Sequence, residues 1–117
     1  MNKNVKKLDE MLLACGLRDN LIGTEFARRA VLMYQPGMSL TKELYPAIAK
    51  AANSTTARVE RAMRHAIESG FDRCGYDAEV LTMFGNTIDP DTGKPKNGEF
   101  IARLARLCRE PGTNYEN

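Results

Sequence analysis

Apolar residues recur at intervals of three and four along most of the chain, and this spacing constrains the fold most strongly. Val5, Leu8, Leu12 and Cys15, for example, fall on one side of a helix. No segment shows the two-residue alternation and β-branched residues typical of a half-buried strand. The sequence therefore predicts an all-α fold.

Chain breakers and capping residues divide this pattern into about six helices joined by short turns. We expect helices over residues 4–15, 24–34, 40–52, 55–68, 77–84 and 98–109. In this scheme Thr24 caps the second helix, Asp77 caps the fifth, and Ser69-Gly70 ends the fourth. Pro46 either sits in a first helical turn or leaves a kink. The predicted architecture is one compact helical bundle.

Length and composition set the broad class. The 117 residues are close to the usual size of one domain, and 43% of them are hydrophobic, as in globular proteins. The formal net charge of +2 is too small to indicate a nucleic-acid partner by itself. Residues 76–117 carry five basic and seven acidic side chains, so we expect any polyanion-binding surface to lie before residue 76.

Three cysteines without a C-x-x-C pair favour reduced, packed thiols over a disulfide framework or a zinc site. No apolar run is long enough for a membrane span, and the N-terminus has no signal-peptide pattern. We therefore expect a cytoplasmic protein with no membrane partner and no metal.

The third and fourth predicted helices have the spacing of a helix-turn-helix unit. Ala49 is a small residue near the end of one helix, and Val59 follows it ten residues later. A small side chain at the first position lets the second helix cross closely, and Val59 fills the angle between them. Asn53 tolerates the left-handed conformation of the turn, and Ser54 or a threonine caps the next helix. This pair of helices is the predicted DNA-binding unit.

The outward side of the helix over 55–68 is rich in arginine. At 100° per residue, Val59, Met63 and Ile67 share the inward side with Ala62 and Ala66. Ala57, Arg61, Arg64 and Glu68 fall on the outward side, and Arg58, Glu60 and His65 lie on its flanks.

Arginine can donate two hydrogen bonds to guanine in the major groove, and glutamate can accept one from cytosine. Arginine and histidine further along the helix, and the hydroxyls of Ser54 and Thr55 at its start, can reach phosphate oxygens. The alternative is a solvated face held by Glu–Arg pairs at helical spacing.

The same segment closely resembles a known family. The matching letters are TKELYP at 41–46, IAK at 48–50 and TTARVERAMRHAIE at 55–68, continuing at Leu81, 84–85, 94–95, Asn97 and 99–102. They resemble the DNA-binding effector domain of the sporulation initiation response regulator of endospore-forming bacteria.

The resemblance implies a six-helix domain that binds a TGTCGAA-like box and contacts RNA polymerase sigma subunits. By position, it implies that Arg58, Glu60 and Arg61 approach bases and that Arg64 and His65 hold phosphates. It makes residues 77–84 a candidate polymerase contact. Family members are switched through an N-terminal receiver domain, which 117 residues cannot also hold. We expect residues 1–117 to be one effector domain, either excised or stand-alone.

Two functional hypotheses remain. The first is a sequence-specific regulator of transcription that binds double-stranded DNA through the major groove, more strongly on tandem boxes where copies touch. The second is a helical module that binds protein and modulates a related regulator. An enzyme is not expected, because His65 is the only histidine and no nucleophile-elbow, Walker or Rossmann signature is present. No cofactor is expected either.

Overall fold

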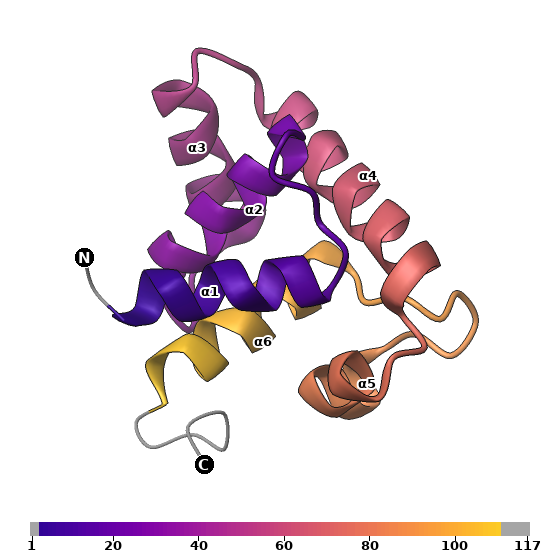
Figure 1. The fold of residues 1–117 in the computed structure, drawn as a ribbon. Helices are drawn as coiled ribbons and strands as arrows, with labels where there is room; N and C mark the ends of the chain where they lie inside the picture. The colour runs from indigo at the N-terminus through magenta and orange to yellow at the C-terminus, as the bar shows by residue number, and fades with distance from the viewer. Residues whose placement is uncertain (1–2, 111–117) are drawn as a thin grey trace.

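The computed structural model describes residues 3–110, which form six α-helices and two shorter helical turns (Figure 1). The α-helices are α1 (Lys3–Ala14), α2 (Ile22–Met33), α3 (Tyr45–Ala51), α4 (Thr56–Cys74), α5 (Ala78–Phe84) and α6 (Asn97–Arg109). A π-helical turn, η1 (Leu40–Leu44), precedes α3, and a 3-10 turn, η2 (Gly85–Thr87), follows α5. Residues 3–110 contain no strand, only an isolated bridge between Asp89 and Lys94. The all-α prediction is confirmed.

Helix α2 lies at the centre of the fold and contacts α1, α3, α4 and α6 (Figure 1). Its buried side, which includes Phe26, Ala27, Ala30 and Val31, joins the inward sides of its neighbours in one hydrophobic core. A second packing centre is aromatic: the ring of Phe84 lies 5.4 Å from Phe71 and 5.5 Å from Phe100, between centroids. These contacts hold α5 and α6 against the carboxyl-terminal part of α4.

The fourth helix is longer than its sequence indicated. It continues through Ser69 and Gly70 to Cys74, so the predicted stop was wrong. A Cβ atom on Gly70 would lie 2.5 Å from the carbonyl oxygen of Cys15. Glycine at this position therefore lets α4 pass close to the end of α1, and this packing outweighs its low helix propensity of about 1 kcal/mol relative to alanine. Gly16, at φ 85°, follows the end of α1 in the left-handed conformation that favours glycine.

Two predicted side-chain caps were also wrong. Helix α2 begins at Ile22, so Thr24 lies inside its first turn. Its side chain is buried there, and its hydroxyl has no hydrogen-bond partner among residues 3–110. Asp77 precedes α5 as expected, but its side chain makes no capping hydrogen bond. Both helices are held by the burial of apolar residues rather than by these caps.

The segment over 40–52 is helical, as predicted, but its first turn is π-helical. Pro46 lies in the first turn of α3, directly after η1. Proline cannot donate a backbone hydrogen bond, and its ring clashes with the carbonyl four residues earlier in a regular helix, so a wider turn accommodates it. Ser39 caps this turn: its hydroxyl accepts from the Lys42 N–H at 3.1 Å, and its own N–H donates to the Glu43 carboxylate at 2.7 Å.

Candidate nucleic-acid interface

The turn between α3 and α4 is fixed by backbone hydrogen bonds and one cap. The N–H of Ser54 donates to the carbonyl of Ala49 at 2.8 Å, and Asn53 adopts the predicted left-handed conformation, with φ 54°. The hydroxyl oxygen of Thr55 accepts from the N–H of Arg58 at 3.2 Å, which makes Thr55 the N-cap of α4. These contacts set the direction in which α4 leaves α3 (Figure 1).

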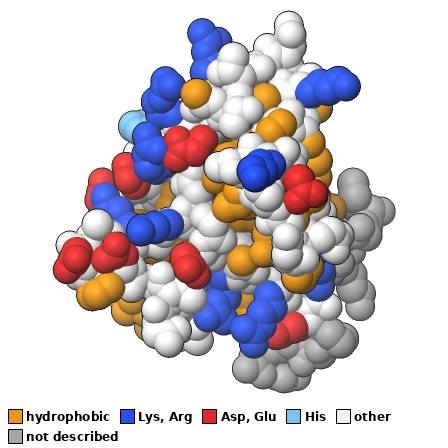
Figure 2. Space-filling view, turned by 180° about the vertical axis from the view of Figure 1, so that it is seen from behind, with side chains coloured by type: hydrophobic (Ala, Val, Ile, Leu, Met, Phe, Trp, Pro, Cys, Tyr) orange, Lys and Arg blue, Asp and Glu red, His pale blue; other side chains and the backbone are white. Residues whose placement is uncertain are grey.

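The inward and outward sides of α4 are as predicted. Val59, Met63, Ala66 and Ile67 are buried, and Ala62 is half-buried against the same core. Ala57, Arg58, Arg61, Arg64, His65 and Glu68 are exposed. Figure 2 shows basic side chains lining the upper left edge, where α4 begins, with acidic side chains more frequent lower on that edge. We call this exposed side of α4, with the turn residues Ser54 and Thr55, the α4 ridge.

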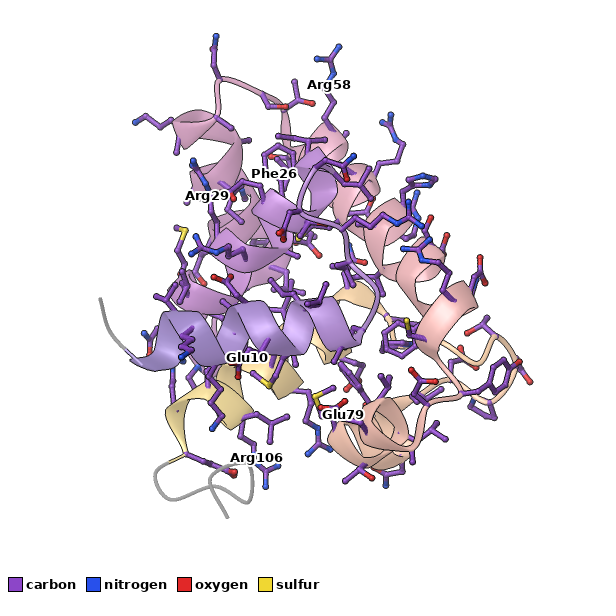
Figure 3. All side chains as sticks on the ribbon, viewed as in Figure 1. Glu10, Phe26, Arg29, Arg58, Glu79 and Arg106 are labelled. Carbon is purple, nitrogen blue, oxygen red and sulfur yellow. The ribbon has the colours of Figure 1, made fainter. Side chains whose placement is uncertain are left out.

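One flank of the α4 ridge faces the start of α2. A shallow groove here is lined by polar and basic side chains of the ridge and by two apolar side chains of α2: Ser54, Arg58, Arg61, His65, Ile22 and Phe26. Arg58 extends from the first turn of α4 into solvent, while Phe26 lies beneath it on α2 (Figure 3). Ile22 is 62% exposed, so an apolar side chain stands at the edge of this basic surface. We call this side the α2 flank.

The opposite flank faces the loop before α6. A groove here is lined by charged and polar side chains of both signs, and we call this side the α6 flank. They are Glu60, Arg64, Glu68, Asp89, Lys94, Lys96 and Asn97. The carboxylate of Glu60 forms an ion pair with Arg64 at 2.5 Å. Glu60 is half-buried and is already paired in the free protein. This is one of the Glu–Arg pairs at helical spacing that the alternative interpretation predicted.

Asn97 links three elements beneath the α6 flank. Its side-chain amide donates to the carbonyl of Glu60 at 3.1 Å, which ties the start of α6 to the backbone of α4. Burial raises the pKa of the Tyr45 phenol on α3, and a side-chain hydrogen bond with Asn97 acts in the opposite direction. Asn97 thus connects α3, α4 and α6 at one point.

The structure distributes the seven predicted contact residues over the α4 ridge rather than in one cluster. Arg58, Arg61 and His65 line the groove on the α2 flank, and Glu60 and Arg64 line the groove on the α6 flank. Helical periodicity placed Arg58, Glu60 and His65 on the flanks, as the structure does, but it placed Arg61 and Arg64 on the side opposite the core rather than beside a groove. It gave no sign of Ile22 or Lys96, because both belong to other elements that only the tertiary fold brings beside α4.

Residues 3–110 also bear on metal binding, thiol chemistry and membrane insertion. Over residues 3–110, no group of three histidine, cysteine or acidic side chains could hold a metal ion. Cys15 and Cys108 are buried free thiols, as predicted, and Cys74 is half-buried. Burial raises the pKa of Cys15 to about 12 and that of Cys108 to about 11, which keeps both protonated. None of the helices in this part of the chain combines the length and apolar character that a membrane crossing requires.

Comparison with known protein families agrees with this architecture. The model of the family described as sporulation initiation factor Spo0A, C terminal, matches residues 8–107, which is most of the chain. The match includes both flanks of the α4 ridge and the turn before it. This family is a DNA-binding effector domain of a sporulation regulator, and it is not enzymatic. The chain belongs to the Spo0A C-terminal family.

Proposed function

We propose that this chain regulates transcription by binding double-stranded DNA at a specific sequence, a TGTCGAA-like box, with α3 and α4 as its helix-turn-helix unit. The observation that carries the proposal is the α4 ridge, on which Arg58, Arg61 and Arg64 are all exposed on one helix that starts at a fixed turn. An α-helix with its side chains is about 10–12 Å across and fits a major groove about 12 Å wide.

Base recognition falls to three residues of the ridge. Arg58 and Arg61 are exposed and can each donate two hydrogen bonds to a guanine. Glu60 can accept from the amino group of a cytosine. Its pairing with Arg64 means that Glu60 turns to the base only when Arg64 has another partner.

The phosphate contacts come from the start and the middle of the ridge. The Thr55 oxygen accepts from the Arg58 N–H, which leaves the hydroxyl hydrogen to donate to a phosphate. Ser54 stands beside it, and His65 lies further along the same flank. Arg64 reaches the phosphates from the α6 flank, where a phosphate would replace Glu60 as its partner.

The test is fluorescence anisotropy with three duplexes, carrying one box, two tandem boxes or a scrambled sequence, each at several salt concentrations. We expect a preference for the box, affinity that falls as salt rises, and tighter binding to tandem boxes through contacts between copies. Arg61→Ala should cost about 1–3 kcal/mol on the box and relax base choice at one position. Arg106→Ala is the control, because Arg106 is also exposed but lies on α6, far from Arg58 (Figure 3).

Equal losses from Arg61→Ala on the box and the scrambled duplex would contradict a base contact. Absence of binding to every duplex at low salt would overturn the DNA proposal and favour the second candidate, a protein-interaction module. One observation supports a protein-binding surface in either case. Tyr76, just before α5, is 90% exposed, and Leu81 of α5 is 45% exposed. Glu79 of the same helix is also exposed (Figure 3). An RNA polymerase sigma subunit is the partner we propose for it.

A further inference from the structure

The loop before α6 places two lysines on the α6 flank of the ridge. The ammonium group of Lys94 pairs with Asp72 of α4 at 2.7 Å, and the hydrogen bond to Asp72 raises its pKa. Lys96 is exposed, and it forms no ion pair with any residue in the described range 3–110. Both belong to the acidic last third of the sequence, where no polyanion contact was expected.

The backbone on both sides of Lys96 is fixed to the rest of the fold. Before it, Lys94 is held by Asp72, and its carbonyl accepts from the N–H of Asp89 at 3.1 Å. After it, Asn97 is buried and donates to the carbonyl of Glu60 on α4. The carbonyl of Lys96 itself accepts from the N–H of Phe100 in the first turn of α6 at 2.9 Å. The base of this side chain is therefore held in place, while its charged end is free.

The geometry of a DNA duplex indicates what Lys96 could contact. A helix that fills the major groove has one row of phosphates along each of its flanks. On the α2 flank, Ser54 and His65 face one row without a competing acidic partner in the groove. On the α6 flank, Arg64 is paired with Glu60, and Lys94 with Asp72. Among the groove-lining cations of that flank, Lys96 is the one without an ion pair in the described residues.

We propose that Lys96 binds a DNA phosphate in the row that faces the α6 flank, and so clamps the duplex from the side opposite Ser54 and His65. This inference rests on the proposed insertion of α4 into the major groove. The amino end of α6 has no side-chain cap, so its N–H groups add positive potential beside the same phosphate, which the first-turn carboxylate of Glu99 partly offsets. Because a phosphate carries no sequence information, Lys96 positions the ridge in the groove and does not choose the base.

The experiment compares wild type, Lys96→Ala, Lys96→Arg and Lys6→Ala by anisotropy on the box and scrambled duplexes, from 50 to 200 mM salt. Lys6→Ala removes the same charge from α1, which lies away from the ridge. We expect Lys96→Ala to weaken binding to both duplexes by the same factor and to lower the salt slope by about 0.9. The loss should therefore be about three- to fourfold larger at 50 mM than at 200 mM salt.

A second measurement identifies the contact itself. Box duplexes that carry one uncharged methylphosphonate at successive positions along each strand should weaken wild-type binding wherever a phosphate is contacted. One such position should have no effect on Lys96→Ala, and Lys96→Arg should behave as wild type. Thermal melting should show that Lys96→Ala is as stable as wild type, since the side chain makes no cap bond.

Two results would overturn the inference, and they are distinguishable. If wild type prefers the box but Lys96→Ala has the same affinity and salt slope, Lys96 does not contact DNA. The same conclusion follows if Lys6→Ala lowers the slope as much as Lys96→Ala does. If wild type binds no duplex at any salt concentration, the proposed DNA function fails, and the role of Lys96 fails with it.

Discussion

The position of α4 depends on a close approach by α2, which the substitution Gly23→Ala would remove. Gly23 is the second residue of α2 and is buried against α4. A Cβ atom there would lie 2.1 Å from the carbonyl oxygen of Ala62 and 2.9 Å from the Cβ of Ala66. Ordinary contact begins near 3.4 Å, so α2 would have to move away from α4 by roughly 1 Å.

The expected loss follows from two opposing effects. Alanine gains up to about 1 kcal/mol over glycine in a helix. Overpacking costs about 1–3 kcal/mol, and the obstacle here is helix backbone, which cannot rotate away as a side chain can. We therefore expect Gly23→Ala to lower the free energy of unfolding by about 2 kcal/mol. With a urea m value of about 1–3 kcal/mol/M, the unfolding midpoint should fall by about 1 M.

The measurement is urea unfolding followed by circular dichroism at 222 nm. Gly98→Ala is the matched control, because Gly98 is also the second residue of its helix. A Cβ there would meet only the terminal Cδ1 of Leu40, at 3.1 Å, and that side chain can move. The control should be at least as stable as wild type, with a gain of up to about 1 kcal/mol from the better helix propensity of alanine. If Gly23→Ala is as stable as wild type, the argument for a required close contact between α2 and α4 is wrong.

Two further predictions concern buried polar and titratable groups. Thr24→Val replaces a buried hydroxyl, which has no hydrogen-bond partner in residues 3–110, by a methyl group. The free energy of unfolding should rise by about 1 kcal/mol, and the urea midpoint should rise with it. A lower midpoint would show that the hydroxyl does form a hydrogen bond. The raised pKa of Cys15 predicts a loss of stability in alkali. Between pH 9 and pH 12 the unfolded thiol releases its proton and the folded thiol keeps it, so the free energy of unfolding falls by about 1.4 kcal/mol per pH unit. Urea midpoints of wild type and Cys15→Ala between pH 9 and 10.5 measure this, and equal slopes would exclude Cys15 as the cause.

Features that depend on local helical periodicity were predicted correctly from the sequence. Predictions failed where the role of a residue depends on its contact with an element far away in the chain. The inward side of α4 was correct because Val59, Met63 and Ile67 repeat at helical spacing. The end of α4 was wrong because Gly70 has no local role; it makes room for Cys15, which lies far away in sequence. Thr24 was misassigned for the same reason, since its position in α2 depends on packing rather than on its capping propensity.

The candidate site divides in the same way. Arg58, Arg61 and Arg64 were identified because a single helix carries them all, so their relative placement follows from 100° per residue. What stands opposite each flank depends on loop closure and helix packing, which periodicity does not encode. Lys96 illustrates this limit: it belongs to the acidic last third of the chain, yet Asn97 and the Lys94–Asp72 pair bring it beside Arg64.

The Glu60–Arg64 pair bears on how the two flanks act together. The side chains of Glu60 and Arg64 are 36% and 47% exposed, so solvent screens their attraction, and an exposed pair at this helical spacing is worth only about 0.3–0.5 kcal/mol. A hydrogen bond from arginine to a phosphate is stronger than this, so DNA can separate the pair. Once Arg64 turns to a phosphate, the Glu60 carboxylate is free to accept from a cytosine. When Arg64 exchanges Glu60 for a DNA phosphate, contact with the DNA backbone and recognition of a base are therefore coupled. Lys96 brings the same phosphate row to the α6 flank before that exchange, because it has no acidic partner of its own to release in the described part of the chain.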